Sequence, residues 1–504
     1  MNALLRALLA LALLVPWLGF AGFPLFDLDE GAFTASTTEM FLRGDWLSTW
    51  LNGAPRHDKP VLAYWLQAAG ASLAGFTEAG FRLPSVLAGS AWVFLTWAFT
   101  ARQAGPRAGV LAAVMVAASL GPLLIAKAAT ADALLNLFLA AAGYAAWLWL
   151  DSRERRWLWL CWAAMALGFL TKGPVAVLVP AGTVLACLAL DRDWRRMGDF
   201  LGDWRAWALF LAIAAPWFAL LTLRDGLGFL AGFFLKHNLG RFSAPMEGHG
   251  GSPFYYLPVL FLSLLPFSGL LFSLAGRLGE AWRTPWLRFG LVWFLLVLLL
   301  FSASGTKLPH YLYYGYGGLI PALAWAALAT RRPGLLLLPA LLAGLAVFFL
   351  PDLLLAFGDR VKAEYAPALA TLDQYFGNLF RLALGLAVVV AAGLILARRP
   401  GAPERLGLAG LALAGAVSLA LLPAAGGLLQ GPVRAAGQAA RQLDGPLVMV
   451  GLNTPSFQTY AGRLVARRPP RSGDLVLVPT RRLDSLPPRL QTWDFGAVSL
   501  ARIR

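Results

Sequence analysis

The sequence predicts a polytopic α-helical membrane protein with a small α/β domain at its C-terminal end. Three observations support this fold class. Of the 504 residues, 59% are hydrophobic and 13% are charged, which is about half the share of charge in a soluble domain. The mean hydropathy is +0.66. Apolar runs of about 18 to 20 residues recur along most of the chain, and one helix needs this length to cross a bilayer.

The apolar runs predict about thirteen membrane-spanning helices, at about 20 residues per crossing. The first run follows Arg6 and resembles a signal peptide. No small-residue cleavage site stands between it and the acidic loop that comes next, so we expect a retained helix. The expected spans are 4–23, 81–100, 108–126, 133–150, 157–171, 174–190, 206–223, 254–275, 287–303, 309–329, 334–350, 379–397 and 406–428.

Arginines in alternate loops predict the orientation of these spans. The basic loops are Arg102 to Arg107, Arg153 to Arg156, Arg192 to Arg205, Arg277 to Arg288, Arg331-Arg332 and Arg398 to Arg405. The positive-inside rule places all of them in the cytoplasm, so the N-terminus is cytoplasmic and the C-terminus extracytoplasmic. These loops and anionic membrane lipids account for the net charge of +16, and we expect no nucleic-acid partner.

Two regions outside the membrane have a pattern of their own. In the outer loop 24–80, residues 32–42 have helical spacing and predict an amphipathic helix at the membrane interface. After the last span, the pattern predicts strands at 446–450, 474–479 and 495–503 and a helix at 456–464. We therefore divide the chain into a transmembrane catalytic domain, 1–430, and an outer α/β domain, 431–504. Cys161 and Cys187 lie in apolar runs and offer neither a disulfide framework nor zinc-type spacing.

The first outer loop contains the residues that point most directly to chemistry. Asp27, Asp29 and Glu30 place three carboxylates within four positions, and Arg56-His57-Asp58-Lys59-Pro60 follows in the same loop. Carboxylates beside a membrane are costly to desolvate, so they usually serve chemistry or ion binding. We therefore expect this loop to form the catalytic edge of a membrane enzyme.

A series of short motifs gives the chain a family resemblance. In order they are Asp29-Glu30, Gly44-Asp45-Trp46, Leu51-Asn52-Gly53, His57-Asp58-Lys59-Pro60, Tyr64-Trp65, Phe81-Arg82-Leu83-Pro84-Ser85, Phe169-Leu170-Thr171-Lys172-Gly173-Pro174, His237-Asn238, Arg241-Phe242, Pro253-Phe254-Tyr255-Tyr256-Leu257-Pro258 and Lys307-Leu308-Pro309-His310-Tyr311. By these motifs the chain resembles polyprenyl-phosphate-sugar-dependent glycosyltransferases of the GT-C class. The nearest groups are the bacterial aminoarabinose lipid A transferases and the protein O-mannosyltransferases.

The resemblance implies a sugar transfer at the outer face of the bacterial inner membrane. The donor is a sugar on undecaprenyl phosphate, and the acceptor is lipid A, a glycan or another cell-envelope molecule. The sugar and the acceptor stay open. The competing hypothesis is a transporter or flippase of a lipid-linked sugar, which predicts polar residues deep inside the spans and two similar halves. A third hypothesis is a non-catalytic membrane scaffold, in which the carboxylates are dispensable.

The resemblance also implies roles for single residues. Asp29 and Glu30 are the catalytic carboxylates, since a carboxylate can take the proton of the acceptor. Cations suit the departing phosphate, and the matching ones are Lys59, Arg241, Lys307 and Lys172. The substrate-lining residues are Asp58, Arg82, Tyr64, Tyr256 and Tyr311. The alternatives are a helix cap for the carboxylates, an interfacial position for Lys59, and an aromatic belt for the tyrosines.

The family pattern further implies a divalent metal as a candidate cofactor. In the family, a carboxylate beside the lysine and a histidine of the large outer loop can hold zinc, and Asp58 and His249 match them here. These ligand types suit zinc or manganese, although two protein ligands make a poor structural site. The chain departs from the family at Asp58, where relatives have Glu, and at Ala32, where they often have Arg. Asp132, which opens a span, is an N-cap, an inward polar contact or a residue of the site.

Overall fold

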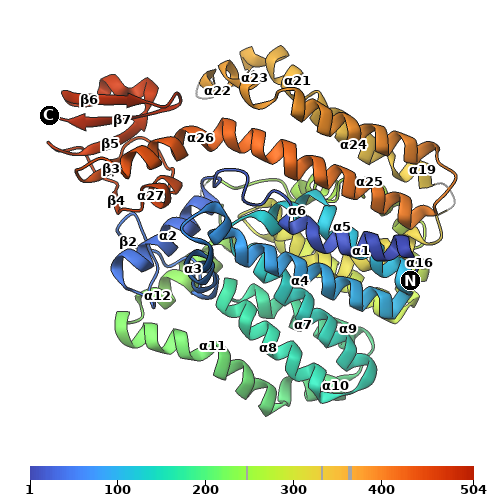
Figure 1. The fold of residues 1–504 in the computed structure, drawn as a ribbon. Coiled ribbons are helices and arrows are strands. Elements are labelled where there is room, and N and C mark those ends of the chain that lie inside the picture. The colour runs from blue at the N-terminus through green and yellow to red at the C-terminus, as the bar shows by residue number, and fades with distance from the viewer. Residues whose placement is uncertain (246–247, 331–332, 361–365) are drawn as a thin grey trace.

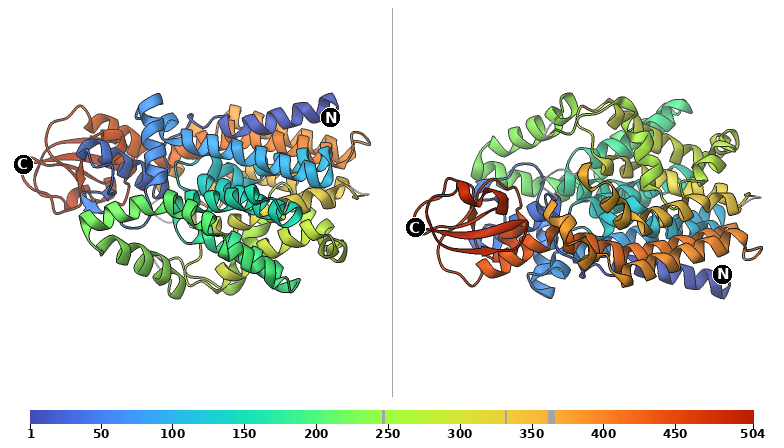
Figure 2. Two further views of the ribbon diagram at one scale, coloured as in Figure 1. Left: turned by 90° about the horizontal axis from the view of Figure 1, so that it is seen from below. Right: turned by 90° about the horizontal axis from the view of Figure 1, so that it is seen from above.

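The structure is a computed structural model that describes residues 1–245, 248–330, 333–360 and 366–504. Most helices run side by side along one direction and form an elongated bundle (Figure 1). The N-terminus lies at one end of this bundle. A small unit that contains a β-sheet and the C-terminus lies at the other end, and both further views agree (Figure 2).

Helices make up most of the fold. The helices of the first half are α1 (Ala3–Leu14), α2 (Asp29–Arg43), α3 (Leu62–Ala74), α4 (Glu78–Ala104), α5 (Pro106–Ala118), α6 (Leu120–Lys127), α7 (Asp132–Ser152), α8 (Arg155–Lys172), α9 (Val175–Leu190), α10 (Trp194–Gly202) and α11 (Trp204–Asp225). Those that follow are α12 (Gly228–Leu230), α13 (Arg241–Ser243), α14 (Tyr256–Ser263), α15 (Leu270–Ala275), α16 (Leu278–Arg283), α17 (Pro285–Ala303), α18 (Tyr316–Ala327), α19 (Pro333–Leu336), α20 (Leu338–Phe348), α21 (Leu350–Ala356), α22 (Ala366–Ala370), α23 (Leu372–Tyr375), α24 (Asn378–Leu396), α25 (Ala402–Ala416), α26 (Leu422–Ala440) and α27 (Ser456–Ala461).

The remaining elements are short helical turns and strands. The turns are η1 (Val15–Trp17), η3 (Pro253–Tyr255), η4 (Pro309–Gly315), η5 (Gly358–Arg360) and η8 (Thr480–Ser485), and the π-helical segments are η2 (Ala231–Gly240) and η7 (Val417–Leu421). The strands are β1 (Trp50–Leu51), β2 (Ala54–Pro55), β3 (Leu447–Met449), β4 (Val465–Ala466), β5 (Leu475–Pro479), β6 (Arg489–Asp494) and β7 (Val498–Ile503).

Helical segments occupy every range in which a membrane span is predicted, but not every one is a continuous long helix. By length and composition, 6 helices in the described part of the chain can cross a membrane, or 8 if each of two bent pairs forms one span. The predicted range 254–275 shows the reason, because segment 264–269, which contains Pro266, separates α14 from α15. Proline interrupts helical hydrogen bonding without reducing the apolar character of a run. Helix length and composition therefore give a smaller number than the predicted thirteen.

The predicted inner and outer loops gather at opposite ends of the bundle. Helices α10 and α16, which lie in the basic loops, are near the N-terminus, whereas α2, α3 and α12 lie at the end that carries the sheet (Figure 1). Another predicted inner loop, Arg331-Arg332, falls outside the described residues. The bundle therefore has one basic end and one end that contains the acidic loop.

Close helix packing inside the bundle depends on small residues. Gly290 of α17 and Gly318 of α18 face one another, and a Cβ atom on Gly318 would lie 2.3 Å from the carbonyl oxygen of Gly290. Backbones approach this closely only where side chains are absent. The crossing places the start of α18, and with it η4, beside α7, whose first residue, Asp132, accepts a hydrogen bond from Tyr314 of η4.

The C-terminal unit is a five-stranded mixed sheet with the strand order β4-β3-β5-β7-β6. Strand β3 pairs in parallel with β4 and β5, whereas β7 is antiparallel to β5 and β6. Helices α26 and α27 pack against it through an apolar cluster that includes Val433, Phe457 and Leu477. A small sheet is present after the last predicted span, and β3, β5 and β7 lie in the three ranges predicted as strands. The prediction missed β4 and β6, and the predicted boundary at 430/431 falls inside α26.

Helix α2 corrects one expectation. It is a helix as predicted, but residues 30–40 are buried, so protein covers both its polar and its apolar side chains there. The C-terminal unit covers it. Thr34 hydrogen-bonds Thr459 at 2.9 Å between their Oγ1 atoms, and Gln458 Nε2 donates to Glu39 Oε1 at 3.0 Å. Polar residues of α2 that an amphipathic helix would expose to water form hydrogen bonds with α27 instead.

A buried ion pair fixes the start of α2. Glu30 Oε1 accepts from Arg82 Nε at 2.7 Å, and Glu30 Oε2 accepts from Arg82 Nη2 at 2.8 Å. The backbone N–H groups of Phe26 and Ala129 donate to the same carboxylate. Both side chains are buried. The pair therefore joins α4, the first loop and the segment before α7 at one point.

We expect Arg82→Met to destabilise the protein by about 3–5 kcal/mol, because it leaves the Glu30 carboxylate buried without its counter-ion. Thermal unfolding of the purified protein in detergent measures this loss. The matched control is Arg156→Met, which removes an exposed pair with Glu154 and should cost about 0–1 kcal/mol. The double variant Glu30→Gln, Arg82→Met should recover part of the loss. Equal melting temperatures for the two single variants would contradict the assignment.

Candidate functional site

The site is a cavity of about 840 Å³ at the end of the bundle that carries the sheet. Segments far apart in the sequence build its wall. The lining residues are Leu28, Asp29, Ala32, Phe33, Leu51, Ala54, Pro55, Arg56, His57, Asp58, Lys59, Thr130, Asp132, Lys172, Arg241, His249, Leu308, His310, Tyr311, Asn453 and Pro455. The structure thus brings together the predicted residues Asp29, Asp58, Lys59, Lys172, Arg241, His249 and Tyr311.

Asp29 has a special position in this wall. It is the first residue of α2, where the helix dipole favours negative charge. Its side chain is exposed, and it makes no hydrogen bond or ion pair with any other residue that the structure describes. The neighbouring Glu30 is fully paired, so the backbone beside Asp29 is held while its carboxylate stays open. Asp29 can therefore accept a proton from a bound molecule.

A second cavity of about 380 Å³ meets the first at Asp29. Its wall is largely apolar, with Phe23, Phe26, Leu124, Ile125 and Leu422. Both cavities are lined by Leu28, Asp29, Thr130, Asp132 and His310. Asp29 thus faces a charged space on one side and an apolar space on the other.

Cations from separate elements gather in the larger cavity. Burial lowers the pKa of Lys59 to about 8, the nearby Asp58 opposes this shift, and the positive charges of Lys172, Arg241 and Arg56 add to it. Like charges lower a lysine pKa in this way only when they lie close by. The cavity is therefore suited to an anionic group such as a phosphate.

The contacts of Asp58 do not fit a metal site. Its two carboxylate oxygens accept from Arg56, at 2.8 Å from Nε and 2.9 Å from Nη2. His249 is exposed, and its carbonyl oxygen accepts from the backbone N–H of Lys307. The described residues include no group of three or more His, Cys, Asp or Glu side chains that could hold a metal ion. The predicted zinc or manganese site gains no support from this geometry.

Asp132 is the centre of a polar group on the inner wall. Its Oδ1 lies 2.5 Å from Lys172 Nζ and accepts from the hydroxyl of Tyr314 at 3.2 Å. His310 Nε2 lies 3.9 Å from the same oxygen. Of the alternatives for Asp132, the inward polar contact is present, and it fixes Lys172 in the wall.

Four other predicted site residues line neither of these two cavities. Arg82 uses its donors on Glu30 and on carbonyls of residues 20–24. Lys307 Nζ donates to the carbonyls of Ser302 and Ser304 at the end of α17. Tyr256 donates to Leu308 O, and Tyr64 is buried in a stack on Phe33. Glu30 lines only the smaller cavity.

The sequence analysis missed several wall residues. Arg56, His57 and His310 stood in quoted motifs but were not selected as site residues, and their closeness to Asp58 or Lys307 was the available signal. Asn453 and Pro455 had no local signal, because they belong to the C-terminal unit. Their neighbour Ser456 donates to Asp27 from its backbone N–H at 3.0 Å and from its hydroxyl. Burial raises the pKa of Asp27 to about 7, and these bonds oppose the shift.

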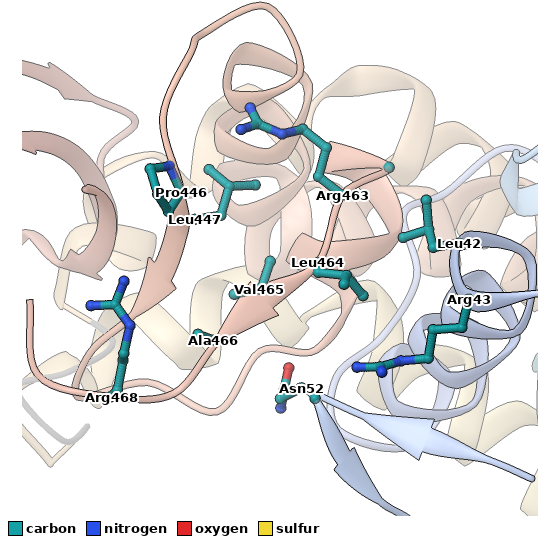
Figure 3. A pocket seen from close by; sticks show the side chains of 12 residues that line it. Leu42, Arg43, Asn52, Pro446, Leu447, Arg463, Leu464, Val465, Ala466 and Arg468 are labelled. Atoms are coloured by element: carbon teal, nitrogen blue, oxygen red, sulfur yellow. The ribbon is translucent and has the colours of Figure 1, made fainter. Parts of the chain in front are cut away.

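A third cavity of about 540 Å³ lies between the C-terminal unit and the first outer loop (Figure 3). Leu42, Arg43 and Asn52 form one side, and residues of strand β4 with Arg463 and Arg468 form the other. Arg43 pairs with Glu39, and Arg468 pairs with Asp474. The β1–β2 hairpin separates this space from the larger cavity, because its tip lines the one and its flanks line the other.

Comparison with known proteins supports the family resemblance. The family model described as dolichyl-phosphate-mannose-protein mannosyltransferase matches residues 58–219. The undecaprenyl phosphate-α-4-amino-4-deoxy-L-arabinose arabinosyl transferase of Pseudomonas paraeruginosa is 33% identical over 419 residues, which is 79% of this chain and 71% of the relative. A second such transferase, from Pseudomonas fluorescens, is 31% identical over 81% of this chain and 65% of the relative. The chain thus spans about two thirds of these relatives.

A solved structure shows the same fold. The crystal structure of ArnT from Cupriavidus metallidurans bound to undecaprenyl phosphate matches with a TM-score of 0.84 and 20% identity, over 98% of this chain and 97% of that one. The predicted GT-C type of fold is confirmed. With the sequence identity and coverage of the Pseudomonas paraeruginosa relative, the chain belongs to the family of undecaprenyl phosphate-aminoarabinose arabinosyl transferases, which are membrane glycosyltransferases.

Proposed function

We propose that this chain transfers a sugar from undecaprenyl phosphate to an acceptor of the cell envelope at the outer face of the bacterial inner membrane. The names of its relatives support the donor class and make 4-amino-4-deoxy-L-arabinose the first sugar to test. Lipid A is the first acceptor to test, before a glycan. One observation carries the site assignment: the open carboxylate of Asp29 lies where two cavities meet.

The donor phosphate binds among the cations of the larger cavity. Lys59, Lys172 and Arg241 supply positive charge from three separate elements. This charge stabilises the phosphate most strongly as its bond to the sugar breaks, because negative charge then builds up on its oxygens. The polyprenyl chain leaves the site toward the membrane part of the bundle.

The acceptor reacts on the side of Asp29. An oxygen of the acceptor attacks the anomeric carbon of the sugar, and the bond between this carbon and the phosphate oxygen breaks. Asp29 takes the proton when that oxygen comes from a hydroxyl group. Undecaprenyl phosphate departs with the electron pair of the broken bond. Glu30 takes no proton in this scheme, because donors already surround its carboxylate, and it acts as a positioning residue.

We also propose the orientation and the number of crossings. The N-terminus lies in the cytoplasm and the C-terminus outside, which agrees with termini at opposite ends of the bundle and basic loops near the N-terminus (Figure 2). The shorter and interrupted helices complete about thirteen crossings. The C-terminal unit then forms a cover on the outer face, over the catalytic loop.

Asp29→Asn should lower kcat by about 10²- to 10⁴-fold, because the amide keeps the shape of the side chain and cannot accept the proton. Radiolabelled sugar on undecaprenyl phosphate, supplied to membranes that contain equal amounts of protein, measures the transfer. Asp373→Asn is the control, since Asp373 is an exposed carboxylate on α23. Equal transfer by wild type and Asp29→Asn would remove Asp29 from the chemistry. Absence of transfer by the wild type over a panel of such donors would overturn the proposed function.

The pKa of about 8 at Lys59 predicts an alkaline limit. The amine is protonated below this pH and neutral above it, so donor binding weakens as pH rises through about 8. The kcat/KM for the donor should fall about tenfold per pH unit beyond this point. Lys59→Arg should remove the limit, because a guanidinium stays protonated. A profile of the wild type that stays flat to pH 10 would contradict the role of Lys59.

A further inference from the structure

The C-terminal unit contributes one polar side chain to the larger cavity among the residues that the structure describes. Asn453 and Pro455 both line it, and they lie in the segment between β3 and α27. The next residue, Ser456, holds Asp27, which is two residues from Asp29. The segment that contains Asn453 is therefore anchored close to Asp29, the proposed base. It belongs to a different part of the chain from the cations Lys59, Lys172 and Arg241. In the proposed scheme, the acceptor occupies that side.

Arg467 sets the orientation of the Asn453 side-chain amide. Arg467 Nη1 donates to Asn453 Oδ1 at 3.2 Å, and Arg467 Nη2 donates to Leu452 O at 3.3 Å. A guanidinium has only donors, so the amide atom that faces it must be the oxygen. The Nδ2 group, with two N–H bonds, then points away from Arg467, and it makes no hydrogen bond with another described residue. The exposed amide thus offers donors to a molecule in the cavity.

The charge of the surrounding unit favours an anionic partner for these donors. Residues 431–504 contain eleven arginines and four aspartates, with no lysine or glutamate. The unit therefore has seven more cationic than anionic side chains, which favours an anionic partner over a cationic one. A positive field raises the local concentration of anionic lipids or glycans at the rim of the cavity.

We propose that Asn453 is a specificity-determining residue that donates from Nδ2 to a phosphate oxygen of the acceptor headgroup, and that Arg467 is its positioning residue. The proposal rests on the proposed transferase function and adds to it the residue that recognises the phosphate of a glycolipid acceptor. It assigns to the C-terminal unit the choice of acceptor, while the transmembrane part holds the donor and the base.

The test is steady-state kinetics of the full-length protein with two acceptors, a phosphorylated glycolipid and the same lipid after phosphatase treatment. Asn453→Asp is the main variant. It keeps the shape and the oxygen that Arg467 binds, so the fold is retained, and it replaces two donors with a negatively charged acceptor. Its KM for the phosphorylated acceptor should rise about 10- to 100-fold, the factor expected for a lost hydrogen bond to a charged group. Its KM for the donor should stay within twofold of the wild type.

Further variants separate recognition from general damage. Arg467→Met should also raise the acceptor KM, by a smaller factor, because the amide can then rotate. Arg504→Met, an exposed arginine of the same unit, should change nothing. Wild type should use the dephosphorylated lipid as poorly as Asn453→Asp uses the phosphorylated one. An unchanged acceptor KM in Asn453→Asp, or a rise in the donor KM instead, would overturn the inference. If the wild type transfers sugar to neither lipid, the proposed transferase function itself is overturned.

Discussion

The buried contact between Arg82 and Glu30 is the constraint on which the site depends. Arg82 also donates to the carbonyl groups of Phe20, Phe23 and Pro24, so one side chain fixes the chain from the end of the first helical segment to the start of α2. Lys127 fixes the preceding part of the chain, because its amine donates to the carbonyls of Val15, Pro16 and Leu18. A loop beside a membrane has few backbone partners. These two cations supply them.

Pairing of charges distinguishes Asp29 from the carboxylates around it. Glu30 is bound by Arg82, Asp58 by Arg56, and Asp132 by Lys172. Each pair lowers the cost of burying its members and also fixes a cation or a loop in the wall. Asp29 is adjacent in sequence to a fully paired residue and is itself open to both cavities. The site thus combines fixed neighbours with one open carboxylate, which is the arrangement that the proposed general base catalysis requires.

The sequence predicted what depends on local pattern. Apolar runs located the helices, and clustered carboxylates and a lysine located the loop that forms one wall of the cavity. Side-chain direction was not available from pattern, which is why Lys307 and Tyr256 were selected although they turn toward backbone carbonyls. Contacts between distant segments were equally out of reach. Ser456 binds Asp27 although 429 sequence positions separate them, and no local feature of either segment predicts this contact. Hydropathy also does not register a break in a helix, so the apolar runs give more spans than the criterion of helix length and composition does.

The β1–β2 hairpin is a thin partition between two cavities. Asn52 and Gly53 at its tip border the cavity of Figure 3, and Leu51, Ala54 and Pro55 border the larger cavity. A substitution in this hairpin therefore changes the shape of both cavities at once. Sequence changes that alter one cavity are limited by their effect on the other. For protein engineering, the hairpin is a poor place to begin changing substrate range. The segment around Asn453 offers an independent handle, because it touches the larger cavity alone.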